Sequence, residues 1–206
     1  NCKVNKYNGV NFPSAAQYFA DQSNGTYRPQ FDVFGPVTLS KKYAHYGRDL
    51  YGYDEGMDSL AADAVVEACK LANEQFPQLN FADYDTDKDG KIDFVYIIYA
   101  GKGQADGGDA NTIWPHNWDI HSARYYKNCT YPQNDCYVDS KLIHTYAVSA
   151  ELEGAGTLGG IGTLCHEFGH VMGLADLYDT ENSTNYEDFL TPNEWDIMDG
   201  GAYNGG

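Results

Sequence analysis

The chain has 206 residues with a formal net charge of −17, and hydrophobic residues make up 42% of it. This length suffices for one domain with a hydrophobic core, or for two lobes around a cleft. The strong negative charge argues against a nucleic-acid partner, because the phosphates would be repelled. No uninterrupted apolar run approaches the roughly eighteen residues that a transmembrane helix requires. We therefore expect neither a membrane span nor a nucleic-acid partner.

The N-terminal part of the chain is polar and rich in turns. Because it opens with Asn1-Cys2-Lys3, without an initiator methionine or a signal peptide, we expect a mature or trimmed piece of a protein. Ser14 predicts the N-cap of a short helix over 15–20, with Gln17 three residues later. Residues 31–39 alternate partly between apolar and polar around a Gly-Pro pair, which predicts a strand, a turn and then a second short extended piece.

A long amphipathic helix is predicted from Asp58 to Phe76, because apolar residues recur at helical spacing and Pro77 follows directly. Asp58 is a suitable N-cap for this helix, which should pack on a sheet. Its acidic side chains are expected on the solvent-exposed face: Asp63, Glu67 and Glu74.

The segment from Asp83 to Asp93 carries acids at alternate positions around Gly90, as in the first half of an EF-hand calcium loop. The closing glutamate is missing: counted from Asp85, the twelfth position is Tyr96. Asp93 could close a shorter loop, and the loop could also begin at Asp83. The alternative to a structural Ca²⁺ site is an acidic turn that caps the following strand. The expected Ca²⁺ ligands are Asp85, Asp87, Asp89 and Asp93.

Two strands are predicted in the middle of the chain. Residues 92–100 are β-branched, aromatic and almost continuously hydrophobic, which indicates a central strand covered on both faces. Residues 142–151 predict another strand. The glycine-rich segment 154–162 lacks the Lys-Ser/Thr of a phosphate-binding loop, so nucleotide binding is not expected. His116 and His121 have no partner at metal-binding spacing, and we expect structural or surface roles for them.

The chain has five cysteines, an odd number. Cys129 and Cys136 bracket a short loop and are a plausible disulfide pair in an oxidising compartment. Cys69 and Cys165 lie in helical patterns and are expected to be buried thiols. Cys2 could pair with either of these two or stay free.

The stretch from Gly159 to Asp176 contains the pattern His-Glu-x-x-His. On a helix, residues four apart share a face, so His166 and His170 can present imidazoles to one metal ion. Glu167 projects toward a different edge of the site, where it can act on a water instead of ligating the metal. Zinc proteases use this arrangement, with two histidine ligands and the glutamate as general base for a water that zinc acidifies.

A third metal ligand is expected shortly after this helix. Gly173 can adopt the left-handed backbone that ends a helix and turns the chain back toward the metal. Asp176, three residues later, is a hard oxygen ligand within reach of the same ion. A second layout would use a glutamate further along the chain, Glu187 or Glu194, but the short turn favours Asp176.

These motifs resemble a known group of enzymes. The pattern His-Glu-x-x-His-x-x-Gly-x-x-Asp over 166–176, with Trp-Asp-Ile-Met-Asp-Gly-Gly over 195–201, resembles metzincin metallopeptidases that use Asp as the third ligand. More narrowly, the chain is similar to the immune inhibitor A family of secreted bacterial proteases. The Asp-Leu-Tyr-Asp continuation over 176–179 and the Ile-Met-x-Gly-Gly turn carry this similarity, which extends from Phe31 onward.

The resemblance implies an α/β zincin fold with a twisted, mostly parallel sheet, a long backing helix, an active-site helix and a small C-terminal subdomain. It implies one catalytic domain over 1–206, with an upper part that ends near 172 and a lower part that begins near 173. Segment 142–151 would be an edge strand that binds the substrate backbone by strand addition. Family members usually continue further, so we expect a truncated lower part.

The resemblance also implies roles for individual residues. Glu167 would be the catalytic base, and Met198 would be the methionine of the Met-turn, a hydrophobic floor under the zinc. Gly173 would be a second structural support of the site. Tyr203 is the candidate donor to the oxyanion, although some metzincins place a tyrosine where this chain has Gly200. The implied zinc ligands are His166, His170 and Asp176.

Together these features predict a zinc endopeptidase that acts on proteins or peptides and is secreted or extracellular, including the bacterial cell surface. The competing hypotheses are a binding module with structural zinc and calcium, and a latent peptidase fragment. A structural zinc normally has four closed protein ligands. Only three are evident in this sequence, which favours the enzyme.

Overall fold

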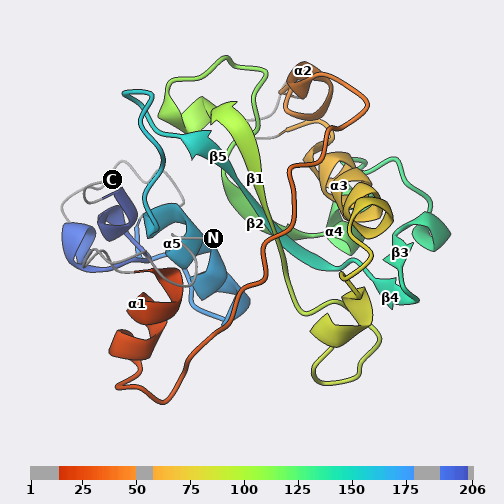
Figure 1. Cartoon of the computed structure of the whole chain (residues 1–206). Helices are drawn as coiled ribbons and strands as arrows, with labels where there is room; N and C mark the ends of the chain where they lie inside the picture. Colours follow the sequence, from red (N-terminus) through yellow and green to blue (C-terminus); the bar gives the residue numbers. More distant parts are fainter. Residues whose placement is uncertain (1–13, 50–57, 179–190, 204–206) are drawn as a thin grey trace. The chain divides into compact units, whose positions relative to one another are not determined.

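The computed structural model describes residues 14–49, 58–178 and 191–203 (Figure 1). The chain divides into two compact units. One unit combines both ends of the chain, 1–33 and 159–206, and the other is the continuous segment 34–158. The predicted boundary between an upper and a lower part near residues 172 and 173 stays a prediction.

The middle unit contains a small mixed sheet. Its three strands are β1 (Val95–Lys102), β2 (His116–Asp119) and β5 (Thr145–Leu152), in the order β1-β5-β2. Strand β1 runs parallel to β5, whereas β2 runs antiparallel to it. The described sheet is therefore mixed, and the expectation of a mostly parallel sheet was wrong.

The positions of the two predicted strands in this sheet are the reverse of the expectation. Strand β5 lies between β1 and β2 in the described sheet, and Tyr146, Ala147 and Val148 are buried, so successive residues on both of its faces are covered. In β1, by contrast, Ile98 is 54% exposed. Segment 92–100 is thus not the central strand, and segment 142–151 is not an edge strand. A hydrophobic run predicts burial but does not say which strands lie beside it.

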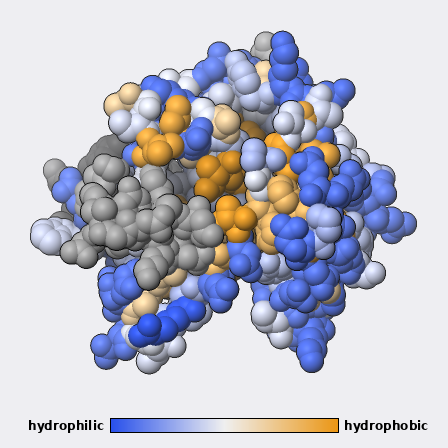
Figure 2. All heavy atoms as spheres, in the orientation of Figure 1, coloured by the Kyte–Doolittle hydropathy of each residue, from blue (hydrophilic) through white to orange (hydrophobic). Residues whose placement is uncertain are grey.

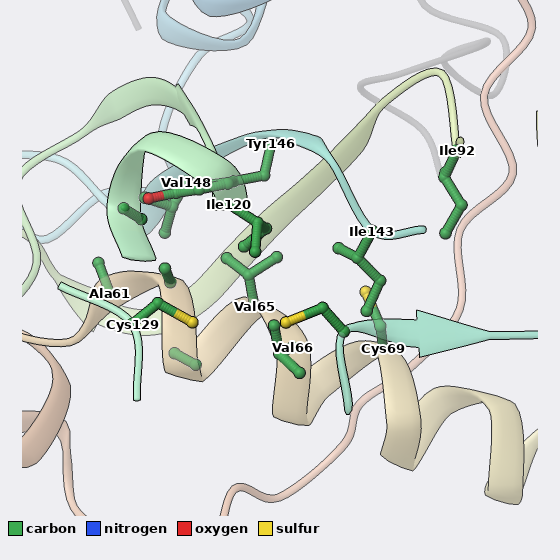
Figure 3. Close-up of a cluster of buried hydrophobic side chains, with 14 of the residues drawn as sticks. Ala61, Val65, Val66, Cys69, Ile92, Ile120, Cys129, Ile143, Tyr146 and Val148 are labelled. Carbon is green, nitrogen blue, oxygen red and sulfur yellow. The ribbon is translucent and has the colours of Figure 1, made fainter. Parts of the chain in front are cut away.

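The hydrophobic core of the middle unit forms between the sheet and two helices, α3 (Ala61–Gln75) and α4 (Ile120–Tyr125). Figure 3 shows Val65 of α3 pointing toward Ile120 of α4 and toward Tyr146 and Val148 of β5. Small and β-branched residues on one face of α3 permit this close packing. The predicted long helix that packs on a sheet is confirmed.

The start of α3 differs from the prediction. Its N-cap is Leu60, and Asp58 instead accepts a hydrogen bond from the Trp114 N–H at 2.9 Å. Burial, followed by the charge of Asp49, raises the pKa of Asp58 to about 8. Asp63 is also buried, where it accepts hydrogen bonds from the N–H and the hydroxyl of Thr130. Helical spacing predicted a solvent-exposed Asp63, but a loop from elsewhere in the chain covers that turn and satisfies the carboxylate.

The other elements of this unit are short. They are α2 (Tyr43–Tyr46), the 3₁₀ turns η1 (Phe81–Tyr84), η2 (Gln104–Asp106) and η3 (Gln133–Asp135), and the hairpin strands β3 (Tyr137–Val138) and β4 (Lys141–Leu142). Segment 31–39 forms no strand, so the strand predicted at its start was wrong.

The unit that contains both ends of the chain is helical in its described part. It comprises α1 (Ala15–Gln22), α5 (Gly162–Val171) and the 3₁₀ turns η4 (Asn193–Trp195) and η5 (Gly200–Tyr203). Ser14 Oγ accepts a hydrogen bond from the Gln17 N–H at 3.1 Å, which confirms the predicted cap of α1. Phe168 of α5 packs edge-to-face on Phe19 and Phe31. Among the described helices, none combines the length and the apolar character needed to span a membrane.

Candidate metal centre

The two histidines of the His-Glu-x-x-His pattern belong to helix α5, which is labelled in Figure 1. Residues four apart on a helix are neighbours on its surface. The Nε2 atoms of His166 and His170 accordingly lie only 3.2 Å apart. This helix therefore places two nitrogen atoms where both could bind one ion.

Helix α5 ends in a Schellman turn that brings the next segment back toward these histidines. Gly173 has a φ of +89°, the left-handed conformation that favours glycine. The N–H of Gly173 donates to the His170 carbonyl at 2.9 Å, and the Leu174 N–H donates to the Gly169 carbonyl at 3.1 Å. These are the paired hydrogen bonds of the Schellman motif. The turn places Asp176 beside the histidines.

Asp176 completes a triangle of ligand atoms. Its Oδ1 lies 3.2 Å from His166 Nε2 and 3.3 Å from His170 Nε2, so the three edges are nearly equal. Metal bonds of about 2.0–2.1 Å in a tetrahedral site give edges of roughly 3.3 Å between ligand atoms. Asp176 Oδ1 is buried and has no hydrogen-bond partner. The triangle fits one face of a tetrahedral zinc site.

The hydrogen bonds of the two imidazoles orient their lone pairs toward this triangle. His166 Nδ1 lies 2.8 Å from the Ile197 carbonyl, and His170 Nδ1 lies 2.9 Å from the Leu174 carbonyl. A carbonyl only accepts, so each Nδ1 carries the proton and each Nε2 keeps its lone pair. Two lone pairs and a carboxylate oxygen at 3.2–3.3 Å repel one another unless a cation lies between them. The described atoms therefore fit a bound metal ion.

Glu167 follows the first histidine and is buried. Burial, followed by the charge of Asp176, raises the pKa of Glu167 to about 8. A raised pKa brings a carboxyl close to the range in which it can both take up and release a proton near neutral pH. The side chain is not a member of the triangle of ligand atoms.

Met198 lies in a tight turn beneath the helix. It is buried, and its N–H donates to Asp196 Oδ1 at 2.9 Å. The carbonyl of Met198 accepts from the Leu177 N–H at 2.9 Å, which links the turn to the segment that carries Asp176. The turn also supplies the Ile197 carbonyl that orients His166. It thus supports two of the three ligand residues.

The comparison with known families agrees with this geometry. Over residues 2–206 the sequence matches the family described as Immune inhibitor A peptidase M6, catalytic domain. The chain belongs to the immune inhibitor A peptidase family. The match is to the catalytic domain of that family.

Two relatives are much longer than this chain, which matches only part of each of them. Immune inhibitor A of Bacillus thuringiensis subsp. alesti is 30% identical over 212 residues, which cover 96% of this chain and 30% of that protein. Pre-pro-metalloprotease PrtV of Vibrio cholerae serotype O1 (strain M66-2) is 28% identical over 215 residues, which cover 96% of this chain and 22% of that protein. The chain thus spans less than a third of the length of either relative.

Tyr178 of the M6 domain is a further residue at the centre that the sequence analysis did not single out. Its ring stacks on His166, with centroids 6.4 Å apart and planes 20° from parallel. Burial, followed by the charge of Asp176 and a hydrogen bond to it, raises the pKa of Tyr178 to about 12. The Asp-Leu-Tyr-Asp continuation contained this residue, but the sequence alone gave no reason to assign it a contact.

Tyr203 and the alternative third ligands, Glu187 and Glu194, are the remaining residues that the sequence analysis considered for the metal centre. Tyr203 is 71% exposed, and its charge contributes to the raised pKa of Tyr178, so the two tyrosines are near each other. Glu194 is not a member of the group of ligand atoms in the described part of the chain, and Glu187 lies outside the described residues.

The acidic loop of the M6 domain brings together three of its four expected ligands. Carboxylate oxygens of Asp85, Asp87 and Asp89 lie within 4.8 Å of one another. Asp93 is not in this group, and its carboxylate accepts hydrogen bonds from the N–H and the hydroxyl of Thr86. A role for Asp93 in closing the loop stays a prediction.

A lysine already contacts this loop. Lys141 Nζ lies 2.6 Å from Asp85 Oδ2, and this hydrogen bond keeps the pKa of Asp85 below its usual range. Asp85 Oδ1 is nevertheless buried without a partner, whereas Asp87 and Asp89 are exposed. On the face shown in Figure 2, the surface around this loop is mainly hydrophilic.

The remaining predictions concern histidines and cysteines. His116 Nδ1 lies 2.7 Å from the Trp114 carbonyl, and His121 is exposed. Neither belongs to a group of metal-ligand atoms among the described residues. Cys69 and Cys165 are buried thiols, as predicted. Cys2 lies outside the described residues.

Proposed function

We propose that this M6 domain is a secreted or extracellular zinc endopeptidase that hydrolyses peptide bonds of proteins. The observation that carries the proposal is the triangle formed by His166, His170 and Asp176. Three lone-pair atoms meet at 3.2–3.3 Å, and Asp176 Oδ1 has no other partner.

The ligand set favours zinc with an open coordination position. Two imidazole nitrogens and one carboxylate oxygen form the three-ligand set of catalytic zinc sites, whereas structural sites are closed by four protein ligands. Zinc held there would supply Lewis acidity to a water and to the scissile carbonyl. The family membership also supports a metal at this place.

Glu167 is the group that moves the proton in this proposal. It takes a proton from the attacking water and later delivers it to the leaving amine, so one carboxyl serves as base and then as acid. Its burial and raised pKa support this role. A carboxyl that stayed fully ionised in water would return the proton less readily.

The surrounding residues hold the ligands in place. Gly173 allows the Schellman turn, and Met198 lies under the helix in the turn that we propose as the Met-turn. Tyr203 as oxyanion donor stays a prediction, and its exposure means that a substrate would have to cover it.

The decisive experiment is cleavage of a quenched-fluorescent casein by the zinc-loaded chain, by Glu167→Gln, and by the matched control Glu74→Gln on the exposed face of α3. We expect chelator-sensitive cleavage by the wild type and by Glu74→Gln. Glu167→Gln should lose nearly all activity and still hold one zinc per chain, because Glu167 is not among the ligands.

Other outcomes decide against this proposal. Unchanged hydrolysis by Glu167→Gln would exclude the glutamate as base. A zinc-loaded wild-type chain without any cleavage would favour the alternatives, a binding module or a latent fragment. Zinc content alone cannot separate these from an enzyme, whereas turnover can.

We also propose Ca²⁺ binding at Asp85, Asp87 and Asp89. The buried, unpaired Asp85 Oδ1 supports this second site. A cation there would share Asp85 with Lys141 or displace the ammonium group. Calcium should raise the thermal unfolding temperature of the wild type, and Asp85→Asn should reduce that increment; an equal increment in both proteins would contradict the site.

A further inference from the structure

Six buried side-chain oxygens in the described part of the chain have no hydrogen-bond partner. Two of them belong to Asp176 and Asp85, at the two centres already proposed. The remaining four belong to Asp49, Asp58, Gln104 and Asn128. Buried acceptors without a partner are costly and rare, so four of them in one region call for a compensating group.

These four residues form one connected neighbourhood in the middle unit. Asp49 and Asp58 pair in an isolated antiparallel bridge, and directly opposite residues of such a pair put their side chains on the same face. Gln104 Nε2 donates to Asp49 Oδ2 at 3.1 Å. Asn128 Nδ2 donates to the main-chain carbonyl of Asp58 at 2.8 Å, and both residues line a cavity of about 250 Å³.

The hydrogen bonds of these side chains leave only acceptors free. Asp58 Oδ2 accepts from the Trp114 N–H, which leaves Oδ1 unpaired. The Asp58 carbonyl and the Asp49 carboxylate can only accept, so Asn128 and Gln104 must direct their NH₂ groups toward them. Their amide oxygens are therefore fixed in place, and flipping either amide would replace a hydrogen bond with a repulsive contact.

No lysine or arginine of the described residues forms an ion pair with Asp49 or Asp58. Asp58 is 5% exposed and Asn128 is 3% exposed, so bulk water does not solvate them. His116 Nδ1 lies 3.9 Å from Asp58 Oδ2 but donates to the Trp114 carbonyl, and burial lowers the pKa of His116, which disfavours a charged ring. The sequence of 50–57 contains neither lysine nor arginine.

We propose that Asp49, Asp58, Gln104 and Asn128 form a binding site for a hard divalent cation, Ca²⁺, separate from the histidine centre and from the acidic loop. Calcium takes six to eight oxygen ligands, and carboxylates and amide carbonyls are typical ones. Four come from these side chains. The adjacent cavity has room for water ligands, each of which occupies about 30 Å³ in the liquid. The site contains no thiolate, and its one nearby imidazole is engaged elsewhere, which disfavours zinc.

Terbium luminescence can test this site selectively. Tb³⁺ replaces Ca²⁺ at oxygen sites and emits when a nearby tryptophan absorbs light. Two of the three tryptophans of the chain flank the site: the Trp114 N–H bonds Asp58, and Trp118 lines the cavity. The zinc-loaded full chain is titrated with Tb³⁺ under tryptophan-selective excitation, and bound Tb³⁺ is then displaced with Ca²⁺.

We expect tryptophan-sensitised emission from the wild type, which Ca²⁺ displaces. Asp58→Asn and Asp49→Asn should each weaken the affinity for Tb³⁺ about tenfold or more, because the number of charged ligands sets the affinity of such sites. Asp85→Asn should leave this emission unchanged, which separates the site from the acidic loop. Asp135→Asn, an exposed acid, is the matched control.

Two results would overturn the proposal. One is an unchanged affinity and stoichiometry for Tb³⁺ in both Asp58→Asn and Asp49→Asn. The other is a combination of two findings: Ca²⁺ does not raise the thermal unfolding temperature of the wild type, and Asp58→Asn unfolds at a higher temperature than the wild type when both are measured without calcium. That second result would mean that a shared proton, and not a cation, joins the two carboxyls. Should Asp58→Asn fail to fold, the half-buried Asp49→Asn carries the same test. The proposal does not depend on peptidase activity.

Discussion

Gly169 of helix α5 lies directly against the sulfur of Met198: a Cβ atom at Gly169 would be 2.6 Å from Met198 Sδ. Gly169 immediately precedes the second histidine of the metal centre. The missing side chain lets the methionine approach the helix turn that carries both His166 and His170. The glycine in the His-Glu-x-x-His pattern therefore has a packing reason in this protein.

This contact predicts that Gly169→Ala destabilises the wild type but stabilises a variant that lacks the Met198 side chain. Gly169→Ala should gain about 1 kcal/mol from helix propensity, but collision with Met198 should cost about 1–3 kcal/mol. We expect net destabilisation of about 1 kcal/mol in the wild type. With Met198→Ala, which itself costs about 2–5 kcal/mol, Gly169→Ala should become stabilising. Urea unfolding of the four proteins measures this cycle, and equal effects in both backgrounds would contradict the contact.

Tyr178 should matter for the metal although it is not a proposed ligand. Its hydroxyl bonds Asp176 and its ring stacks on His166, so it orients two ligands. Tyr178→Phe should lower zinc affinity or kcat/KM by about 10–100-fold, as is typical for residues that orient metal ligands. Competition with a chromophoric chelator measures the affinity. Tyr125→Phe, at an exposed tyrosine of the middle unit, is the control and should change neither quantity.

Asp119 should stabilise helix α4 in a pH-dependent way. Its carboxylate caps the helix by accepting from the Ser122 N–H at 2.8 Å. Burial raises the pKa of Asp119, but the hydrogen bonds from Ser122 outweigh burial and the net pKa is lowered. Asp119→Ala should cost about 0.5–2 kcal/mol at neutral pH.

The sign of the Asp119 effect follows from the lowered pKa. The charged form is favoured in the folded state, so the contribution is present above the unfolded pKa of about 3.9 and is lost as the pH falls through the lower folded value. The difference between wild type and Asp119→Ala should therefore shrink in acid. Asp119→Asn keeps an uncharged cap, so the difference in the free energy of unfolding between Asp119→Asn and Asp119→Ala should not change with pH. A wild-type advantage that grows in acid would refute the assignment.

The prediction that Cys129 and Cys136 form a disulfide remains testable. Both are free and buried in the structure, and their side chains hydrogen-bond to each other. Exchange with oxidised glutathione would oxidise the two thiols to a disulfide and reduce the glutathione disulfide to two thiols. Closing the 129–136 loop should stabilise the fold by about 2–3 kcal/mol.

Mass spectrometry after alkylation under denaturing conditions can decide the pairing. The oxidised wild type should lose two alkylation sites, and Cys129→Ser should leave Cys136 alkylated. Alkylation of both cysteines after oxidative refolding would show that the pair stays reduced.

The sequence by itself determined the features that depend on local geometry. Positions four apart on a helix share a face, so His166 and His170 could be paired without a structure. A glycine that ends a helix turns the chain back, so Gly173 pointed to Asp176. The alternating acids of the loop 83–93 likewise brought three carboxylates together, because their spacing is set by a single turn.

Only the tertiary structure decided the relationships between distant segments. The periodicity of a strand says which residues are buried but not which strands lie beside it, so β5 and β1 exchanged the predicted central and outer positions. Asp63 looked solvent-exposed on its own helix, yet Thr130 covers it. The neighbourhood of Asp49, Asp58, Gln104 and Asn128 joins segments far apart in the chain. Such contacts depend on how the chain packs in three dimensions, which local spacing does not encode.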